Sequence, residues 1–164
     1  MSEGIRGRRF AWWTSEGIKG EAMIEQLAIF SENKPGRLER ITDALAKAGV
    51  NLRAIHVASL GEMGVIKIVV NRPAAAFEAL SEFGPVRKLP ALAVRLPDRP
   101  GALHQVTAVL SRAGINIENA SGFAVSGGDA ILILEVADLP AAERALADAD
   151  FKTLDEGEFE TAVA

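Results

Sequence analysis

The chain contains no cysteine and no tyrosine, and only two of its 164 residues are histidine. Without cysteine there is no disulfide bond, thiolate metal site or cysteine nucleophile, although the cellular compartment stays open. The formal net charge of −4 provides no general basic field for nucleic acid. No apolar run approaches the roughly 18 residues of a membrane helix, and no apolar stretch near the start resembles a secretory signal. We therefore expect a soluble, cytoplasmic protein that binds neither nucleic acid nor membranes.

Recognisable catalytic motifs are lacking as well. The sequence has no HExxH, CxxC or GxSxG motif and no glycine-rich phosphate loop. His56 lies in a predicted strand, where a surface or interface position is more typical than a base. His104 lies in the first turn of a predicted helix, where an exposed position and a ligand contact both remain open. No spacing groups serine, threonine and carboxylates into a triad, so we expect no enzymatic activity, catalytic residue, metal site or cofactor.

The chain does contain an internal repeat. The segment NKPGRL at residues 33–38 returns as DRPGAL at residues 98–103, an offset of 65 residues (100 − 35). The register continues without a gap to Gly49/Gly114 and Asn51/Asn116. A fixed period of this length is too long for a solenoid unit and suits a small domain. Because a domain of roughly 65–70 residues is marginal alone, we expect the two copies to share an interface, and each to carry one copy of a site.

Hydrophobic periodicity predicts the same order of elements in both copies. In the first copy we expect a strand at 24–30, a helix that starts after Asn33 and ends before Gly49, strands at about 51–58 and 65–70, a helix at about 74–82 and a strand near 86–89. Apolar residues at helical spacing form the buried face of the first helix and of its repeat: Leu38, Ile41, Leu45 and Ala48, then Leu103, Val106, Leu110 and Ala113. The second copy then has strands at 116–125 and 130–136, a helix at about 140–148 and a last strand at 151–154.

This β-α-β-β-α-β order is the ferredoxin-like order, an α+β fold with two helices on one face of an antiparallel sheet. The predicted domains are residues 23–90 and 91–164, joined almost without a linker at Leu89-Pro90-Ala91. Residues 1–22 lie outside the repeat and contain Trp12-Trp13. One hypothesis is a disordered extension, and the other is an arm whose tryptophan pair docks on a partner or on the body.

The repeated turns can bind an anion. The first N–H groups of a helix have no internal partner and carry a partial positive charge, which suits a carboxylate. Gly36 and Gly101 lack a Cβ, which lets a ligand approach the backbone. Pro35 and Pro100 fit the first helical turn.

The same turns carry groups for a cation. Asn33 and Asp98 are good N-cap residues, and either side chain can also accept a hydrogen bond from an ammonium group. Asn51 and Asn116 start the second strand of each copy and are expected to reach the same edge. A carboxylate site beside an ammonium site describes an α-amino acid. The alternative is that these residues only start helices and bind nothing.

The two segments from residue 33 to 52 and from 98 to 117 resemble ACT domains, which are small regulatory modules of amino-acid metabolism. The resemblance rests on the pattern D/N-x-P-G-x-L followed by A-G-I/V-N and covers about residues 24–164. It implies a ligand, usually an amino acid, near the loop after the first strand and at an interface between ACT units. The implied contacts are Asn33, Pro35, Gly36, Arg37, Leu38 and Asn51 in the first copy, and Asp98, Pro100, Gly101, Ala102, Leu103 and Asn116 in the second. Asn33 stands where an acid is frequent, which favours the second copy for ammonium binding.

A chain of this length has no room for a fused enzyme, so it resembles the stand-alone tandem ACT proteins. We expect an allosteric regulatory protein that senses an amino acid and modulates a separate metabolic enzyme or regulator. The alternative is a structural subunit whose ACT units only mediate oligomerisation. RNA binding, which ferredoxin-like sheets also support, needs sheet aromatics and a basic surface that this sequence does not offer.

One strand predicts an interface. In Ala130-Ile131-Leu132-Ile133-Leu134 both faces are apolar, whereas a sheet with one solvated face alternates. Helices cover one side, and another ACT unit, from this chain or from a second copy in a homodimer, covers the other. A strand buried centrally within its own domain is the alternative.

Overall fold

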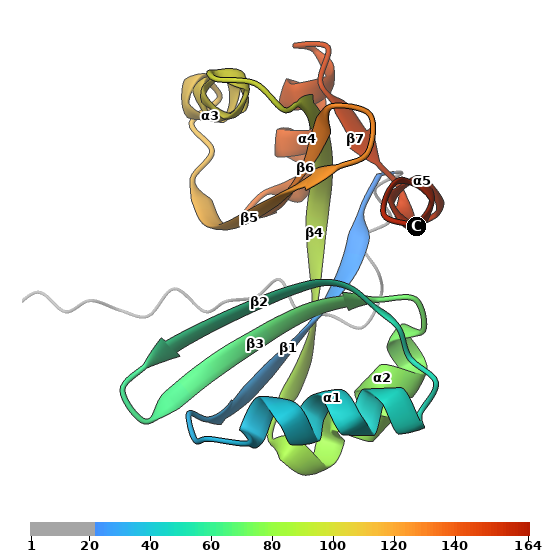
Figure 1. Cartoon of the computed structure of the whole chain (residues 1–164). Coiled ribbons are helices and arrows are strands. Elements are labelled where there is room, and N and C mark those ends of the chain that lie inside the picture. The colour runs from blue at the N-terminus through green and yellow to red at the C-terminus, as the bar shows by residue number, and fades with distance from the viewer. Residues whose placement is uncertain (1–21) are drawn as a thin grey trace, which may run out of the picture.

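A computed structural model describes residues 22–164 (Figure 1), so both hypotheses for the Trp12-Trp13 segment lie outside the described residues. Unit 1 contains β1 (Ile24–Glu32), α1 (Arg37–Lys47), β2 (Leu52–Leu60), β3 (Met63–Val70), α2 (Pro73–Leu80), a 3-10 turn (Ser81–Phe83) and the first half of β4 (Val86–Pro97). Unit 2 contains the second half of β4, α3 (Ala102–Arg112), β5 (Ile117–Val125), β6 (Asp129–Val136), α4 (Leu139–Ala147), β7 (Lys152–Leu154) and α5 (Glu156–Ala162). The predicted order of elements is therefore present in both units.

The two units share one strand. The first half of β4 pairs with β1, from Ile29↔Val86 to Ile24↔Ala91, and its second half pairs with β6 and β7. The expected junction at Leu89-Pro90-Ala91 is therefore the middle of a continuous 12-residue strand. The strand orders are β2-β3-β1-β4 in unit 1 and β5-β6-β4-β7 in unit 2, and every pair is antiparallel.

Each unit has its own core between its helices and one face of its sheet. In unit 1, Leu27 and Ile29 of β1 pack with Ile41 and Leu45 of α1, as the helical spacing predicts. In unit 2, the core contains Leu92, Val94, Val106, Leu110, Leu132 and Leu134. We call the opposite face of each sheet its back face.

The predicted helical stripe is wrong at its first position. Leu38 and Leu103 are 40% and 51% exposed, because each lies in the first turn of its helix beside the loop and points away from the core. Ala113 at the other end of α3 is exposed as well. These two leucines consequently belong to the surface around the repeated turns.

The back faces of the two sheets meet in a third core. It joins Ile24 and Val69 of unit 1 to Ile131 and Ile133 of unit 2. The prediction that another unit covers the second face of the Ala130–Leu134 strand is thus confirmed, and the cover comes from the same chain. Leu132 and Leu134 face the helices of unit 2, whereas Ile131 and Ile133 face unit 1.

The C-terminal helix α5 completes this third core and was not predicted. Its Phe159 is buried there and meets Phe123 of β5 edge to face, with ring centroids 6.4 Å apart. The sequence carried a signal for it, since Asp155 and Glu158 form a capping box.

Candidate functional site

The helix that follows each repeated turn begins with a left-handed glycine. Gly36 has φ 81° and Gly101 has φ 88°, and each is the N-cap of its helix with no side-chain cap. The expectation that Asn33 and Asp98 are N-caps is therefore wrong, and Pro35 and Pro100 precede the helices instead of lying in their first turns. The reason is that each helix begins three residues later than a cap at Asn33 or Asp98 would start it, and the N-cap has a positive φ, which glycine adopts without strain.

Both turns leave N–H groups free. The first helical bonds run from the N–H of Arg40 to the Gly36 carbonyl (3.1 Å) and from that of Gln105 to the Gly101 carbonyl (3.1 Å). The preceding two N–H groups in each helix make no hydrogen bond within residues 22–164: Leu38 and Glu39, and Leu103 and His104. A Cβ built on either glycine would meet no heavy atom within 4 Å. Each helix start is thus an open, partly positive surface.

Asn33 and Asp98 have different roles. The N–H and side-chain amide of Asn33 donate to the carbonyls of Glu62 (2.8 Å) and Gly61 (3.2 Å), which ties the turn to the β2–β3 hairpin. The N–H of Asp98 donates to the equivalent carbonyl of Gly128 (2.9 Å), but its exposed carboxylate accepts no hydrogen bond from the described residues. The Asp98 carboxylate is therefore available to a ligand.

The charges beside the turns also differ. Lys34 forms an ion pair with Glu32 (3.0 Å), and this hydrogen bond holds the pKa of Glu32 below its ordinary value. In unit 2 the equivalent of Glu32 is Pro97, so Arg99 has no such carboxylate beside it. Unit 2 consequently presents a cationic and an anionic side chain next to the same helix start.

Asn51 and Asn116 lie at the other end of the sheets. Leu52, next to Asn51, pairs with Val70, whereas the Asn33 turn adjoins the Leu60–Met63 end of the same strands. The eight residues of β3 separate the two ends by about 25 Å at about 3.3 Å per residue. The expectation that these asparagines reach the edge of the turn is wrong, because α1 and α3 carry the chain back along the sheet before each second strand begins. The Asn51 N–H instead donates to the side-chain oxygen Oδ1 of Asn71 (2.9 Å).

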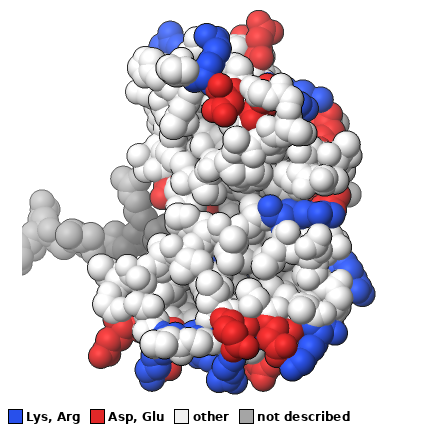
Figure 2. Space-filling view, in the orientation of Figure 1, with Lys and Arg blue, Asp and Glu red and all other residues white. Residues whose placement is uncertain are grey.

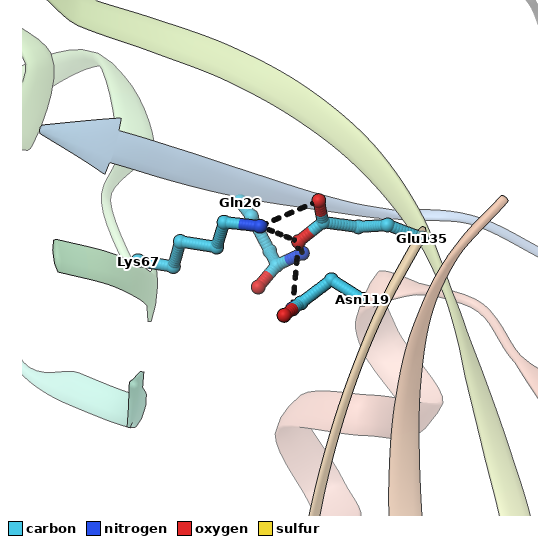
Figure 3. Close-up of polar contacts among 4 residues, drawn as sticks. All are labelled: Gln26, Lys67, Asn119 and Glu135. Carbon is cyan, nitrogen blue, oxygen red and sulfur yellow. Dashed lines mark hydrogen bonds and ion pairs between the residues drawn. The ribbon is translucent and has the colours of Figure 1, made fainter. Parts of the chain in front are cut away.

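A polar cluster that the sequence analysis missed lies where the back faces meet (Figure 3). Glu135 of β6 accepts hydrogen bonds from Lys67 (2.7 Å to both carboxylate oxygens), from Gln26 (3.1 Å) and from Asn119 (3.1 Å). Lys67 and Glu135 are each 13% exposed. Only the pairing of sheets from both units brings these side chains together, so no local pattern indicated them.

The two histidines and the potential metal ligands identify no further candidate site in the described residues. His104 is exposed on α3, which was one of the two alternatives for this residue. It lines a shallow groove with Arg112 and Phe151. His56 is half-buried on the back face of β2. Within residues 22–164, no three histidine, aspartate or glutamate side chains are placed to hold a metal ion, and no helix is long and apolar enough to cross a membrane.

The fold and the duplicated turns define a tandem α+β module. The model of the ACT domain pair family matches residues 22–161, and the chain belongs to that family. No curated protein matches it.

Solved structures have the same fold. Protein BT0572 from Bacteroides thetaiotaomicron is 29% identical with a TM-score of 0.79, over 84% of this chain and 96% of that one. The ligand-free regulatory subunit of aspartate kinase from Thermus thermophilus is 21% identical with a TM-score of 0.59, over 78% and 92%. The corresponding subunit from Thermus flavus is 20% identical with a TM-score of 0.54, over 79% and 93%. The fold of this chain is thus the fold of these solved structures and of the ACT domain pair family.

Proposed function

We propose that this chain is a non-catalytic regulatory protein, made of two ferredoxin-like ACT units, that binds an amino acid and modulates a separate enzyme or regulator of amino-acid metabolism. The observation that carries the proposal is the duplicated helix start, with free N–H groups beside an open left-handed glycine. The regulatory aspartate kinase subunits, whose fold it shares, support a regulatory role.

The proposed ligand contacts are the turn residues Asn33, Pro35, Gly36, Arg37 and Leu38 and their unit 2 counterparts. The ligand carboxylate accepts from the helix-start N–H groups. In unit 2 the Asp98 carboxylate accepts from the ligand ammonium group, and Leu103 offers an apolar surface for a side chain. Asn51 and Asn116 are left out because they lie at the far end of each sheet.

The proposed surroundings are an ordinary soluble cytoplasmic setting without nucleic acid. On the face seen in Figure 2, Lys and Arg are interspersed with Asp and Glu over both units, so that face presents no continuous basic patch. A mixed surface of this kind does not attract a polyanion.

Titration calorimetry with each of the twenty amino acids tests the proposal. We expect heat with one or a few of them, with a stoichiometry of up to two per chain because the turn is duplicated. Silence with all twenty would refute amino-acid sensing. It would favour the second candidate, a structural subunit whose ACT units only mediate oligomerisation.

A further inference from the structure

Exposed apolar side chains are unevenly divided between the units. Among the described residues, the large hydrophobic side chains that stay exposed are Phe30, Leu38, Ile55, Val57, Leu60, Met63 and Leu103. All but Leu103 belong to unit 1. Apolar groups concentrated on one part of a surface mark an interaction site more often than scattered ones do.

Part of this surface forms one patch on the back face of unit 1. The strand register places Phe30 beside Val65, Val65 beside Ala58, and Leu60 beside Met63. We call these five residues the hairpin patch. Leu60 is 91% exposed and Met63 is 54% exposed, although both are large and apolar.

The internal repeat shows that the hairpin patch lacks a cover that its counterpart has. At the 65-residue offset, Ala58 and Leu60 correspond to Phe123 and Val125 of β5. Those two side chains are partly buried in the core that α5 completes. Unit 1 has no helix after its last strand, because β4 continues directly into unit 2. The hairpin patch therefore lies on the same back face of unit 1 that packs against unit 2 at its other end.

Charges of opposite sign border the hairpin patch. Arg87 of β4 lies over the Phe30 ring, with its guanidinium carbon 6.0 Å from the ring centroid. Glu62 lies at the β2–β3 turn, across the sheet from β4. Both are exposed, and neither has an ion-pair partner in residues 22–164.

We propose that the hairpin patch binds the same patch of a second copy of this chain, face to face across a two-fold axis. A two-fold contact needs a self-complementary surface. The axis brings Arg87 of each copy to Glu62 of the other and removes Leu60 and Met63 from water. This inference goes beyond the proposed function, because it concerns assembly without ligand.

Sedimentation velocity of the full chain over a range of concentrations tests the proposal. We expect a monomer–dimer equilibrium that Leu60→Lys weakens by about tenfold or more, since a lysine would have to lose its hydration in the contact. Ile55→Lys is the matched control. It puts the same side chain on the same strand but on the helix-covered face, and it should leave the equilibrium unchanged. Circular dichroism checks that both variants are folded.

Exchanging the charges of Arg87 and Glu62 provides a second test, which does not depend on the stability of the core because both side chains are exposed. Arg87→Glu and Glu62→Arg should each weaken the dimer, and the double variant should restore it, because the pair is re-formed in reverse.

A wild-type monomer at all concentrations would overturn the proposal, as would a chain that dimerises only after removal of residues 1–21, which would mean that this segment occupies the patch. A dimer that Ile55→Lys weakens and Leu60→Lys does not would also overturn it, because the contact would then involve the edge of β2 and not the hairpin patch.

Discussion

At the residue scale, Asp98 is the side chain whose role the structure changes most. Capping is excluded because the N-cap of α3 is Gly101, without a side-chain cap. Asp98→Asn should therefore weaken amino-acid binding at the unit 2 turn by about 1 kcal/mol or more, through loss of a charged hydrogen bond. Asp138→Asn is the control, since Asp138 caps α4 (2.9 Å to the Ala141 N–H) and asparagine caps about as well. Unchanged affinity in calorimetry of Asp98→Asn would remove Asp98 from the site.

Gly101 gives a second prediction at this scale. Gly101→Asn should abolish binding at the unit 2 turn while the fold survives, because asparagine tolerates the left-handed region and its side chain would fill the open space over the N–H groups. Gly114→Asn is matched to it, with φ 70° and equally open surroundings at the other end of α3. Calorimetry should separate the two variants, and equal binding by both would place the ligand elsewhere. A branched valine at Gly101 would mix backbone strain with loss of space.

At the element scale, α5 should loosen on acidification. The pKa of Glu158 lies below its ordinary value of 4.5, first because Lys152 bonds to it and then because the Asp155 N–H does. A carboxyl whose pKa is lowered by folding stabilises the helix above its ordinary pKa, and this contribution is lost as the pH falls through the folded value. Hydrogen exchange of residues 156–164, corrected for intrinsic rates, should therefore rise at about pH 4 and below relative to pH 6. In the Glu158→Gln variant, the amides of α5 should exchange faster at pH 6, and most of this pH dependence should be lost. A wild-type helix that is equally protected at both pH values would contradict the assignment.

At the scale of the whole molecule, Glu135 holds the two units in register. Glu135→Met leaves the Lys67 ammonium poorly compensated between the sheets and should lower the free energy of unfolding by about 3 kcal/mol. Replacing both Lys67 and Glu135 by methionine removes both charges and should cost clearly less than either single replacement. Urea unfolding of the wild type, Lys67→Met, Glu135→Met and the double variant forms a double-mutant cycle. Additive effects in that cycle would show that the pair does not join the units.

Local sequence determined the order of the elements and the positions of the turns along the chain. Preferences within a few residues explain the strands with period-two hydrophobicity, the helical stripes that end at Gly49 and Gly114, and the glycines at the repeated turns. Because the chain repeats, each of these signals occurs in both copies. These signals yielded the order of elements, the doubly buried strand Ala130–Leu134 and the location of the candidate site. They erred at Asn33 and Asp98, where a cap and a turn residue have the same sequence signature.

Only the tertiary structure decided how distant segments meet. The register of β2 on β3 puts Asn51 far from the turn, and the continuation of β4 through both sheets fixes the two units against each other. The contact of back faces assembles Gln26, Lys67, Asn119 and Glu135 from four strands, and it gives α5 a place to bury Phe159. These outcomes depend on strand pairing over long sequence separations, which periodicity within a segment does not encode. The same pairing leaves the hairpin patch uncovered, so the surface that distinguishes unit 1 from unit 2 is a property of the fold rather than of the repeat.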